Sequence, residues 1–307
     1  MKNQLAFVLS GGGSRGALQV GALRALYEAG LHPDILVGTS VGAINAAYLA
    51  LNGSNLPSLD KMAVVWREAA KADLLPANYL WLTVRTLFRR PAAYTAQHMR
   101  DFYIAHGISP ELKFKDIQDV RLVLVASDLN SGKPVLYGLD EQDRILEGLL
   151  ASTALPPWVI PYERDNCLLM DGGVVSNLPI EPAMAVGATE IIALDLADPP
   201  QEPLSTNRGF GPFLNKLVFT VEQRQQDLEL ALAEARGIPI THIHLRSKEV
   251  VPLWDFQHTD ELIAEGYEIA RQEIEKRHGY SHSALGQKIG GIVRSIKSKF
   301  TRKKAQI

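Results

Sequence analysis

The residues that could carry chemistry in this chain begin with a serine between two glycines. Ser40 lies in the run Gly-Thr-Ser-Val-Gly, which follows the apolar residues 35–37 and precedes an alanine-rich stretch. A serine at a sharp turn from strand to helix adopts strained dihedrals, and glycines at positions 38 and 42 allow the neighbouring backbones to approach. At a helix N-terminus its oxygen also lies where negative charge is stabilised. The pattern predicts a nucleophile for acyl transfer, although a glycine-flanked tight turn without a catalytic role has the same spacing.

A glycine-rich segment near the N-terminus could bind an anion. The apolar residues 5–9 lead into Ser-Gly-Gly-Gly-Ser-Arg-Gly, residues 10–16, and a helix with periodic apolar positions is expected to follow. Successive glycines allow several backbone N–H groups to point into one concavity. In a parallel βαβ unit the first and second loops lie at the same edge of the sheet, so this loop is expected beside Ser40. Gly12 and Gly13 could then donate hydrogen bonds to an oxyanion.

The same loop also satisfies the dinucleotide-binding pattern, with Gly11, Gly13 and Gly16 at the G-x-G-x-x-G positions. Such a site requires an acidic residue at the end of the second strand, where it would bind ribose hydroxyls. Here the second predicted strand ends directly before Ser40, and Asp34 lies at its other end. A dinucleotide-binding oxidoreductase is therefore the weaker alternative.

An aspartate at the end of a later predicted strand could serve as the base. The apolar residues 168–170 are followed by Asp171, Gly172 and Gly173. Two glycines let the chain turn away at once, so Asp171 could reach a serine and accept its proton directly, as a dyad without histidine. An aspartate at a strand end is also a common turn former.

A histidine could complete a triad instead, since the order Ser40, Asp171, then His242 or His244 is that of α/β-hydrolases. The nucleophile of that fold follows several strands, however, whereas Ser40 follows only the second predicted one. His242 and His244 alternate along residues 241–245, which is typical of strand residues that face one side. The sequence thus favours the dyad, and the remaining histidines lack the spacing of metal ligands.

Composition limits the class of protein further. The 307 residues are 46% hydrophobic, carry a net charge of −2 and include one cysteine, Cys167. This length can bury a large core, and a single cysteine excludes an internal disulfide and fits a reducing compartment. The apolar run 5–9 is too short for a signal peptide. No stretch reaches about 18 uninterrupted apolar residues, so no membrane span is expected.

Two further segments could contact lipid. Residues 79–90 are aromatic and basic without acidic residues, which suits either a core helix or a cap over the active site. From Gly286 onward there are seven basic residues and no acidic one, and apolar residues recur at three- and four-residue steps. This pattern predicts an amphipathic helix attracted to an anionic membrane surface, although a helix docked on its own domain would have the same pattern.

Together, the motifs at residues 10–16, 38–42 and 171–173 resemble those of the patatin-like phospholipase family of serine acyl hydrolases, over roughly residues 5–196. The resemblance implies that Ser40 is the nucleophile and Asp171 its base. It also implies roles for the surrounding residues: Gly11, Gly12, Gly13, Arg15 and Gly16 in the oxyanion loop, Gly38 and Gly42 at the nucleophile turn, and Gly172 and Gly173 in the Asp-Gly-Gly motif.

The resemblance implies an α/β fold with three layers, α/β/α, and a mainly parallel central sheet. Residues 56–118 would contain a helical cap, residues 197–280 would complete the domain, and residues 285–307 would form the basic tail. The implied activity is hydrolysis of acyl esters from phospholipids, lysophospholipids or neutral glycerides. No metal, organic cofactor or nucleic acid is expected, and the location would be cytoplasmic with peripheral contact to the inner face of the membrane. A non-catalytic lipid-binding protein is the other alternative.

Overall fold

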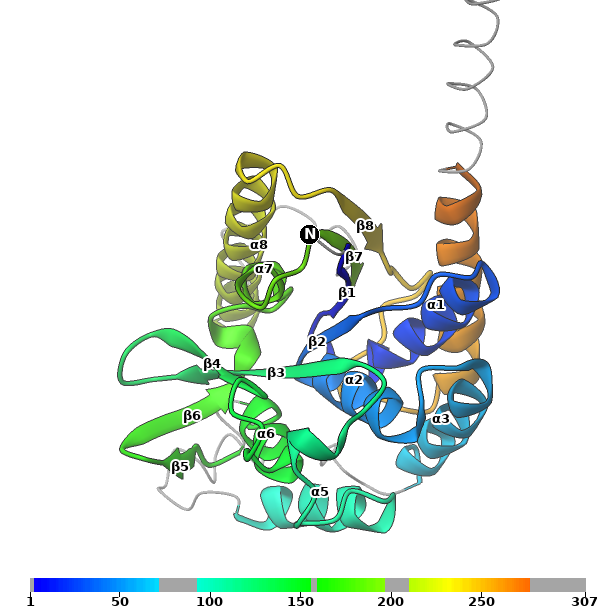
Figure 1. Cartoon of the computed structure of the whole chain (residues 1–307). Helices are drawn as coiled ribbons and strands as arrows, with labels where there is room; N and C mark the ends of the chain where they lie inside the picture. Colours follow the sequence, from blue (N-terminus) through cyan, green and yellow to red (C-terminus); the bar gives the residue numbers. More distant parts are fainter. Residues whose placement is uncertain (1–2, 72–92, 156–158, 197–209, 277–307) are drawn as a thin grey trace, which may run out of the picture.

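The computed structural model describes residues 3–71, 93–155, 159–196 and 210–276, which form a central sheet between two layers of helices (Figure 1). Across the sheet the strands are β5 (Tyr162–Arg164), β6 (Cys167–Asp171), β3 (Arg121–Asp128), β2 (Ile35–Thr39), β1 (Leu5–Leu9), β7 (Glu190–Asp195) and β8 (Ile240–His244), and β4 (Lys133–Tyr137) pairs with β3 outside this path. The five strands from β3 to β8 are parallel, and β4, β5 and β6 join antiparallel. The predicted three-layer fold is confirmed.

The helices divide into two layers (Figure 1). They are α1 (Gly16–Glu28), α2 (Val41–Asn52), α3 (Leu56–Ala69), α5 (Ala93–Ala105), α6 (Ile145–Ser152), α7 (Ile180–Ala185), α8 (Phe210–Ala235) and a helix over residues 259–276, with short 3₁₀ turns η1 (Gly13–Arg15), η2 (Phe114–Asp116) and η3 (Gly172–Val174). One core packs α1, α2, α3, α5, α6 and the helix over residues 259–276 on the sheet, and a second core packs α7 and α8 on the opposite face.

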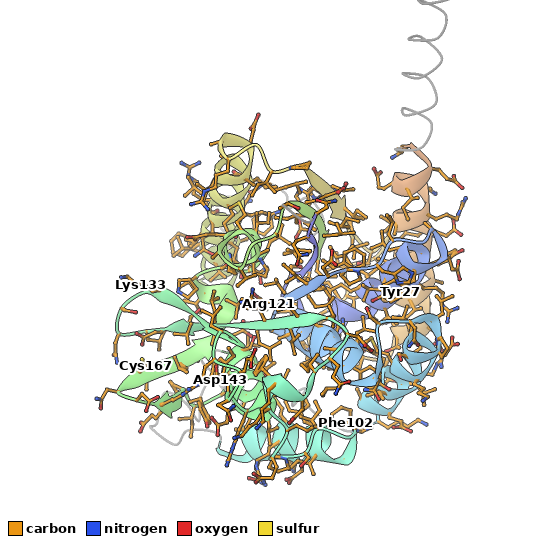
Figure 2. The ribbon with its side chains drawn as sticks, viewed as in Figure 1. Tyr27, Phe102, Arg121, Lys133, Asp143 and Cys167 are labelled. Atoms are coloured by element: carbon orange, nitrogen blue, oxygen red, sulfur yellow. The ribbon has the colours of Figure 1, made fainter. Side chains whose placement is uncertain are left out.

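Alternation along the central strands explains the two cores. In β1, Phe7 and Leu9 belong to the first core, whereas Ala6 and Val8 belong to the second. Because successive strand residues face opposite sides, a strand covered on both faces must be apolar throughout. Side chains fill the space on both faces of the sheet (Figure 2). Strands β1, β2 and β3 are parallel neighbours connected by helices, so the loops after β1 and β2 lie at the same edge of the sheet.

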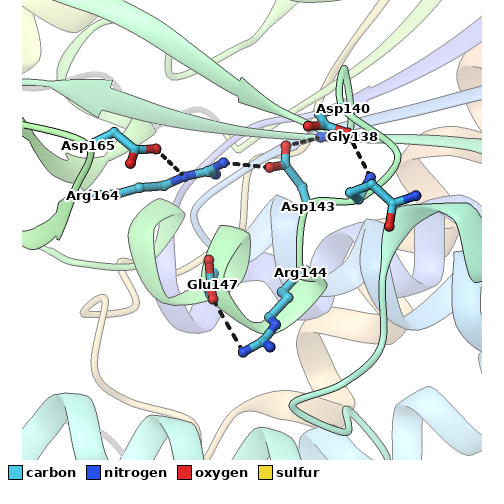
Figure 3. A network of polar contacts seen from close by, with 8 residues as sticks. Gly138, Asp140, Asp143, Arg144, Glu147, Arg164 and Asp165 are labelled. Atoms are coloured by element: carbon cyan, nitrogen blue, oxygen red, sulfur yellow. Dashed lines mark hydrogen bonds and ion pairs between the residues drawn. The ribbon is translucent and has the colours of Figure 1, made fainter.

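A polar network holds the antiparallel part of the sheet against the start of α6 (Figure 3). Arg164 of β5 donates a hydrogen bond of 2.7 Å to Asp143, whose other carboxylate oxygen accepts from the Gly138 N–H at 3.3 Å. Arg144, directly before α6, lies 3.8 Å from Glu147 within it. The network fixes the entry of α6, whose last residue contacts the candidate site.

Several predicted segments lie outside the described residues. These include the aromatic and basic residues 79–90 of the expected cap and the basic tail, residues 285–307. Within the parts of the chain that the structure covers, none of the helices combines the length and apolarity needed to cross a bilayer.

Candidate active site

Ser40 lies on a strained turn between β2 and α2. Its backbone dihedrals are φ 54° and ψ −124°, a region that residues with a side chain rarely occupy. A Cβ atom at Gly38 would lie 2.4 Å from the Gly42 carbonyl oxygen, and one at Gly42 would lie 2.2 Å from the Leu9 carbonyl oxygen. Both positions therefore require glycine, as predicted for a nucleophile turn. The turn leaves Ser40 partly exposed at the N-terminus of α2.

Asp171 is presented to Ser40 by the end of β6. The strand pairs with β3 so that Asp171 lies opposite Ala126, and the next residue must be glycine because a Cβ at Gly172 would lie 2.3 Å from the Val125 carbonyl oxygen. Asp171 Oδ1 accepts a hydrogen bond of 2.8 Å from the Gly173 N–H. Its Oδ2 is buried and has no hydrogen-bond partner among the described residues. A carboxylate oxygen left in this way is costly and ready to accept a proton.

The environment of Asp171 tunes its acidity. Burial raises the pKa of the carboxyl to about 6, although the Ser40 hydroxyl and the Gly173 N–H act in the opposite direction. Only 3% of the residue is exposed, so its charged form is poorly solvated. Asp171 is thus a stronger base than an exposed aspartate while still ionised near neutral pH.

Two N–H groups of the glycine loop have no hydrogen-bond partner among the residues that the structure describes. The N–H groups of Ser10 and Gly11 donate to the carbonyl oxygens of Leu194 and Asn177, and those of Ser14, Arg15 and Gly16 also have backbone acceptors. By contrast, the N–H groups of Gly12 and Gly13 have no hydrogen-bond acceptor within the described part of the chain. These two glycines are also the partly exposed ones, whereas Gly11 is buried. Two accessible amides without acceptors can bind an anion.

Close packing shapes the glycine loop. A Cβ at Gly11 would lie 3.1 Å from Cβ of Ser40 and 2.5 Å from Oδ1 of Asn177, so the loop passes directly over the serine. A Cβ at Gly12 would lie 2.7 Å from the side chain of Leu196. Arg15 is buried, and its Nε donates to the Gly12 carbonyl oxygen at 3.3 Å. The structure thus brings together all three motifs predicted to form the site.

A buried polar network that the sequence did not reveal supports the loop. Asn45 of α2 donates to the Gly16 carbonyl oxygen and to Gln19 Oε1, both at 3.0 Å, and accepts from Trp66 at 3.0 Å. Gln19 in turn donates to the Ser10 carbonyl oxygen at 2.9 Å. The network connects the start and end of the glycine loop to the helix that carries Ser40.

The segment after Asp171 is held by a buried acid. Glu229 of α8 accepts hydrogen bonds from the Ser176 hydroxyl at 2.6 Å and from the Glu181 N–H at 2.8 Å. Burial raises the pKa of Glu229 to about 7, although these donors act in the opposite direction. Ser176 precedes Asn177, whose carbonyl oxygen accepts from Gly11, so Glu229 positions the segment that supports the loop.

The backbone of Ser40 is held by a second serine. Ser152, the last residue of α6, accepts a hydrogen bond of 3.0 Å from the Ser40 N–H and donates one of 2.6 Å to the Val125 carbonyl oxygen. Ser152 is fully buried. The Ser40 N–H is therefore occupied by a protein acceptor, unlike those of Gly12 and Gly13.

Replacement of Ser152 by alanine is expected to lower any turnover that depends on the Ser40 turn by about tenfold and to cost about 1–3 kcal/mol of stability. The change removes the acceptor of the Ser40 N–H and leaves buried polar groups unpaired. Steady-state kinetics and urea unfolding measure the two effects. Ser131→Ala removes a hydroxyl from the exposed β3–β4 turn and should leave kcat unchanged. A Ser152→Ala protein with wild-type kcat would limit Ser152 to a structural role.

His242 and His244 lie on β8 and contact Asp195 instead of Ser40 or Asp171. His242 Nε2 is 3.0 Å and His244 Nδ1 is 3.3 Å from the same Asp195 oxygen, Oδ2. Burial favours a higher pKa for Asp195, but hydrogen bonds from the two histidines hold this pKa well below its usual range. The structure therefore places both histidines in a separate cluster with an ionised carboxylate.

The fold and site define a class: a three-layer α/β protein with a serine on a strained turn, facing a buried aspartate beneath a glycine loop. The profile of the patatin-like phospholipases matches residues 7–184, which is more than half of the chain. The chain belongs to the patatin-like phospholipase family.

Curated relatives agree with this assignment. Human patatin-like phospholipase domain-containing protein 6 is 32% identical over 207 residues, which are 66% of this chain and 14% of that protein. Lysophospholipase nte1 of Aspergillus terreus is 28% identical over 71% of this chain and 13% of its own length. The neuropathy target esterase sws of Drosophila melanogaster is 28% identical over 67% of this chain and 14% of its own length. The chain thus spans about one seventh of the relatives it matches.

Among solved structures, VipD from Legionella pneumophila matches with a TM-score of 0.44 and 14% identity, over 89% of this chain and 67% of that one. The type III effector ExoU matches with a TM-score of 0.36 and 19% identity, over 90% of this chain and 53% of that one.

Proposed function

We propose that this protein is a lipid acyl hydrolase that cleaves carboxylic ester bonds through a Ser40–Asp171 dyad and an acyl-enzyme. Such an enzyme belongs to the carboxylic ester hydrolases, of the phospholipase A, lysophospholipase or esterase type. The observation that carries the proposal is that one carboxylate oxygen and two backbone N–H groups around Ser40 have no hydrogen-bond partner in the described part of the chain. Asp171 Oδ2 lacks a donor, and the Gly12 and Gly13 N–H groups lack an acceptor, among the residues that the structure describes.

The proposed mechanism uses these groups in turn. Asp171 takes the hydroxyl proton as Ser40 Oγ attacks the ester carbonyl carbon, and the Gly12 and Gly13 N–H groups bind the resulting oxyanion. Collapse of the tetrahedral intermediate breaks the ester C–O bond, and the proton held by Asp171 passes to the leaving alcohol. Water, deprotonated by the same carboxylate, then attacks the acyl carbon of the acyl-enzyme. The bond between Ser40 Oγ and the acyl group breaks, Ser40 takes the proton back from Asp171, and the fatty acid is released.

The substrate class rests on the family and the relatives. The matching family is named for phospholipases, and the fungal relative is named a lysophospholipase. We therefore propose glycerophospholipids or lysophospholipids as the natural esters. Peripheral contact with a membrane through residues 285–307 stays a prediction.

The test is release of p-nitrophenol from short- and medium-chain p-nitrophenyl esters by the wild type and by Ser40→Ala. The wild type should turn over these esters, and Ser40→Ala should lose at least about 10³-fold in kcat, because no other group supplies the nucleophile. Circular dichroism checks that both proteins are folded. Fatty acid release from lysophosphatidylcholine then tests the lipid substrate.

Two outcomes would contradict the proposal. Equal background rates for both folded proteins, together with binding to lipid vesicles, would support the non-catalytic lipid-binding protein. A thermal midpoint raised by NAD(H), NADP(H) or a flavin would support a dinucleotide-binding protein, because a ligand that binds only the folded state stabilises it.

A further inference from the structure

Three side chains with metal-ligating atoms meet at the carboxyl ends of β7 and β8. Asp195 ends β7, and β8 is in register with it so that His242 lies opposite Ala193 and His244 opposite Asp195. Paired residues of a parallel ladder face the same side of the sheet, and Ala193 belongs to the core beneath α8. The carboxylate and both imidazoles therefore converge on the α8 face. Their ligand atoms all lie within 4.8 Å of one another.

Three nitrogen atoms converge on one carboxylate oxygen of this cluster, Asp195 Oδ2. Gln226 Nε2 of α8 lies 2.6 Å from Asp195 Oδ2 and 3.3 Å from His242 Nε2, which is itself 3.0 Å from the same carboxylate oxygen. His242 Nε2 and the Gln226 amide can both donate to Asp195 Oδ2, so hydrogen bonds already hold the carboxylate beside the imidazole. With the ring proton on Nδ1 instead, the Nε2 lone pair lies beside the carboxylate oxygen, where the two atoms could share one cation. Turning the amide would place Gln226 Oε1 against Asp195, acceptor against acceptor.

We propose that Asp195, His242 and His244 bind a divalent transition-metal ion such as Zn²⁺. Two imidazoles and one carboxylate are a ligand set typical of Zn²⁺ and its neighbours in the first transition row. Bond lengths of about 2.0–2.2 Å in a tetrahedral site place ligand atoms roughly 3.4 Å apart. The separations of 3.0 and 3.3 Å from Asp195 Oδ2 are close to this value. With an ion bound, both imidazole lone pairs and the carboxylate oxygen would share it as their common partner.

The surroundings suit such a site. Gln226 can donate to the ligating carboxylate, as outer-shell groups of metal sites commonly do. Asp195 and His242 are largely buried, with 6% and 16% of their side chains exposed, whereas 58% of His244 is exposed. The ion therefore has a route from solvent, and water can fill the remaining coordination position.

The proposed site is linked to the glycine loop. Leu196, directly after Asp195, donates its N–H to the Ser10 hydroxyl at 2.8 Å, and its side chain packs against Gly12. An ion on Asp195 would hold the end of the strand on which that loop rests. The proposed ester hydrolysis uses no group of this cluster, so metal binding and hydrolysis can be tested separately.

Isothermal titration calorimetry with ZnCl₂ tests the proposal on the full chain, without an affinity tag and after removal of metals with EDTA. The wild type should bind one Zn²⁺ per chain near neutral pH. His244→Ala should weaken binding by at least about tenfold, and this exposed edge residue can be replaced with little effect on folding. Gln226→Ala keeps all three ligands and should weaken binding about 10- to 100-fold as an outer-shell change.

The matched control uses the other pair of closely spaced histidines. His278→Ala/His282→Ala removes two imidazoles beyond the described residues and should bind Zn²⁺ like the wild type. Unchanged binding in His244→Ala would overturn the proposal, as would binding that is lost only in the control variant. Absence of any saturable zinc binding by the folded wild type at millimolar zinc would overturn it as well.

Discussion

Replacement of Asp171 by asparagine should remove turnover and at the same time make the protein more stable above about pH 6. Asparagine has nearly the same shape, and its Oδ1 can still accept the Gly173 N–H bond. Its amide cannot take the proton of Ser40, so kcat should fall by at least about 10³-fold. The amide also carries no charge, and this determines the effect on stability.

The sign of the stability effect follows from the raised pKa of Asp171. Burial raises this pKa from 3.8 to about 6 in the folded protein, so the folded state holds the proton more tightly than the unfolded chain. The contribution of Asp171 to the free energy of unfolding is therefore complete below about pH 4. This contribution is lost as pH rises through about 6, where the carboxyl must ionise while buried. A difference of about two pKa units corresponds to at most about 3 kcal/mol. Asparagine avoids this loss.

Urea unfolding of both proteins at about pH 5 and about pH 8 measures the effect. The advantage of Asp171→Asn should be larger at the higher pH. Asp119→Asn, at an exposed position, removes one charge without burial and should change stability little at either pH. In the wild type, kcat/KM should fall as pH drops through about 6, because the free enzyme's base becomes protonated. An Asp171→Asn protein with wild-type turnover would contradict the dyad.

The parts of the site that could be predicted from the sequence depend on short stretches of chain. The turn at Ser40 requires glycine at position 38 because of a backbone contact with Gly42 four residues later, and at position 42 because of a backbone contact with Leu9 on the neighbouring strand. The approach of residues 10–16 to Ser40 followed from the common edge of consecutive parallel strands. In each case local geometry, together with one general rule of topology, was sufficient.

The residues that support the site could not be predicted in this way. Ser152 is an ordinary polar residue at the end of an apolar helix, and its contact with the Ser40 N–H joins positions 112 residues apart. Asn45 and Gln19 look like solvent-facing residues of their helices but are fully buried. A single sequence carries no signal for such pairings, because they arise only when the helices pack.

The histidine cluster shows the same limit. Alternation along the predicted strand correctly placed His242 and His244 on one face, yet the residue they contact, Asp195, comes 47 residues before His242. No spacing rule connects the three residues, since their meeting depends on the pairing of β8 with β7. The sequence therefore offered the histidines as partners for Asp171, the proposed base, and the structure gives them another carboxylate.

The strain at Ser40 leads to the second large effect, a position at which glycine should give a more stable protein than alanine. At φ 54° and ψ −124° a Cβ atom costs about 1–3 kcal/mol, and glycine does not have this cost. Glycine loses more backbone entropy on folding, by about 0.5–1 kcal/mol, which reduces the gain. Ser40→Gly should therefore be more stable than Ser40→Ala by about 1 kcal/mol, and both should lack esterase activity.

Comparing glycine with alanine isolates the Cβ atom, because neither variant has the hydroxyl that faces Asp171. Urea unfolding gives the difference, and Ala231→Gly on the exposed face of α8 serves as the matched control. In an ordinary helix the same exchange should destabilise by about 1 kcal/mol, the opposite sign. If Ser40→Ala is as stable as Ser40→Gly, the turn is relaxed in solution. The reversed sign at Ser40 would instead mean that the protein keeps a conformational cost there to hold the Ser40 side chain, the proposed nucleophile, at the start of α2.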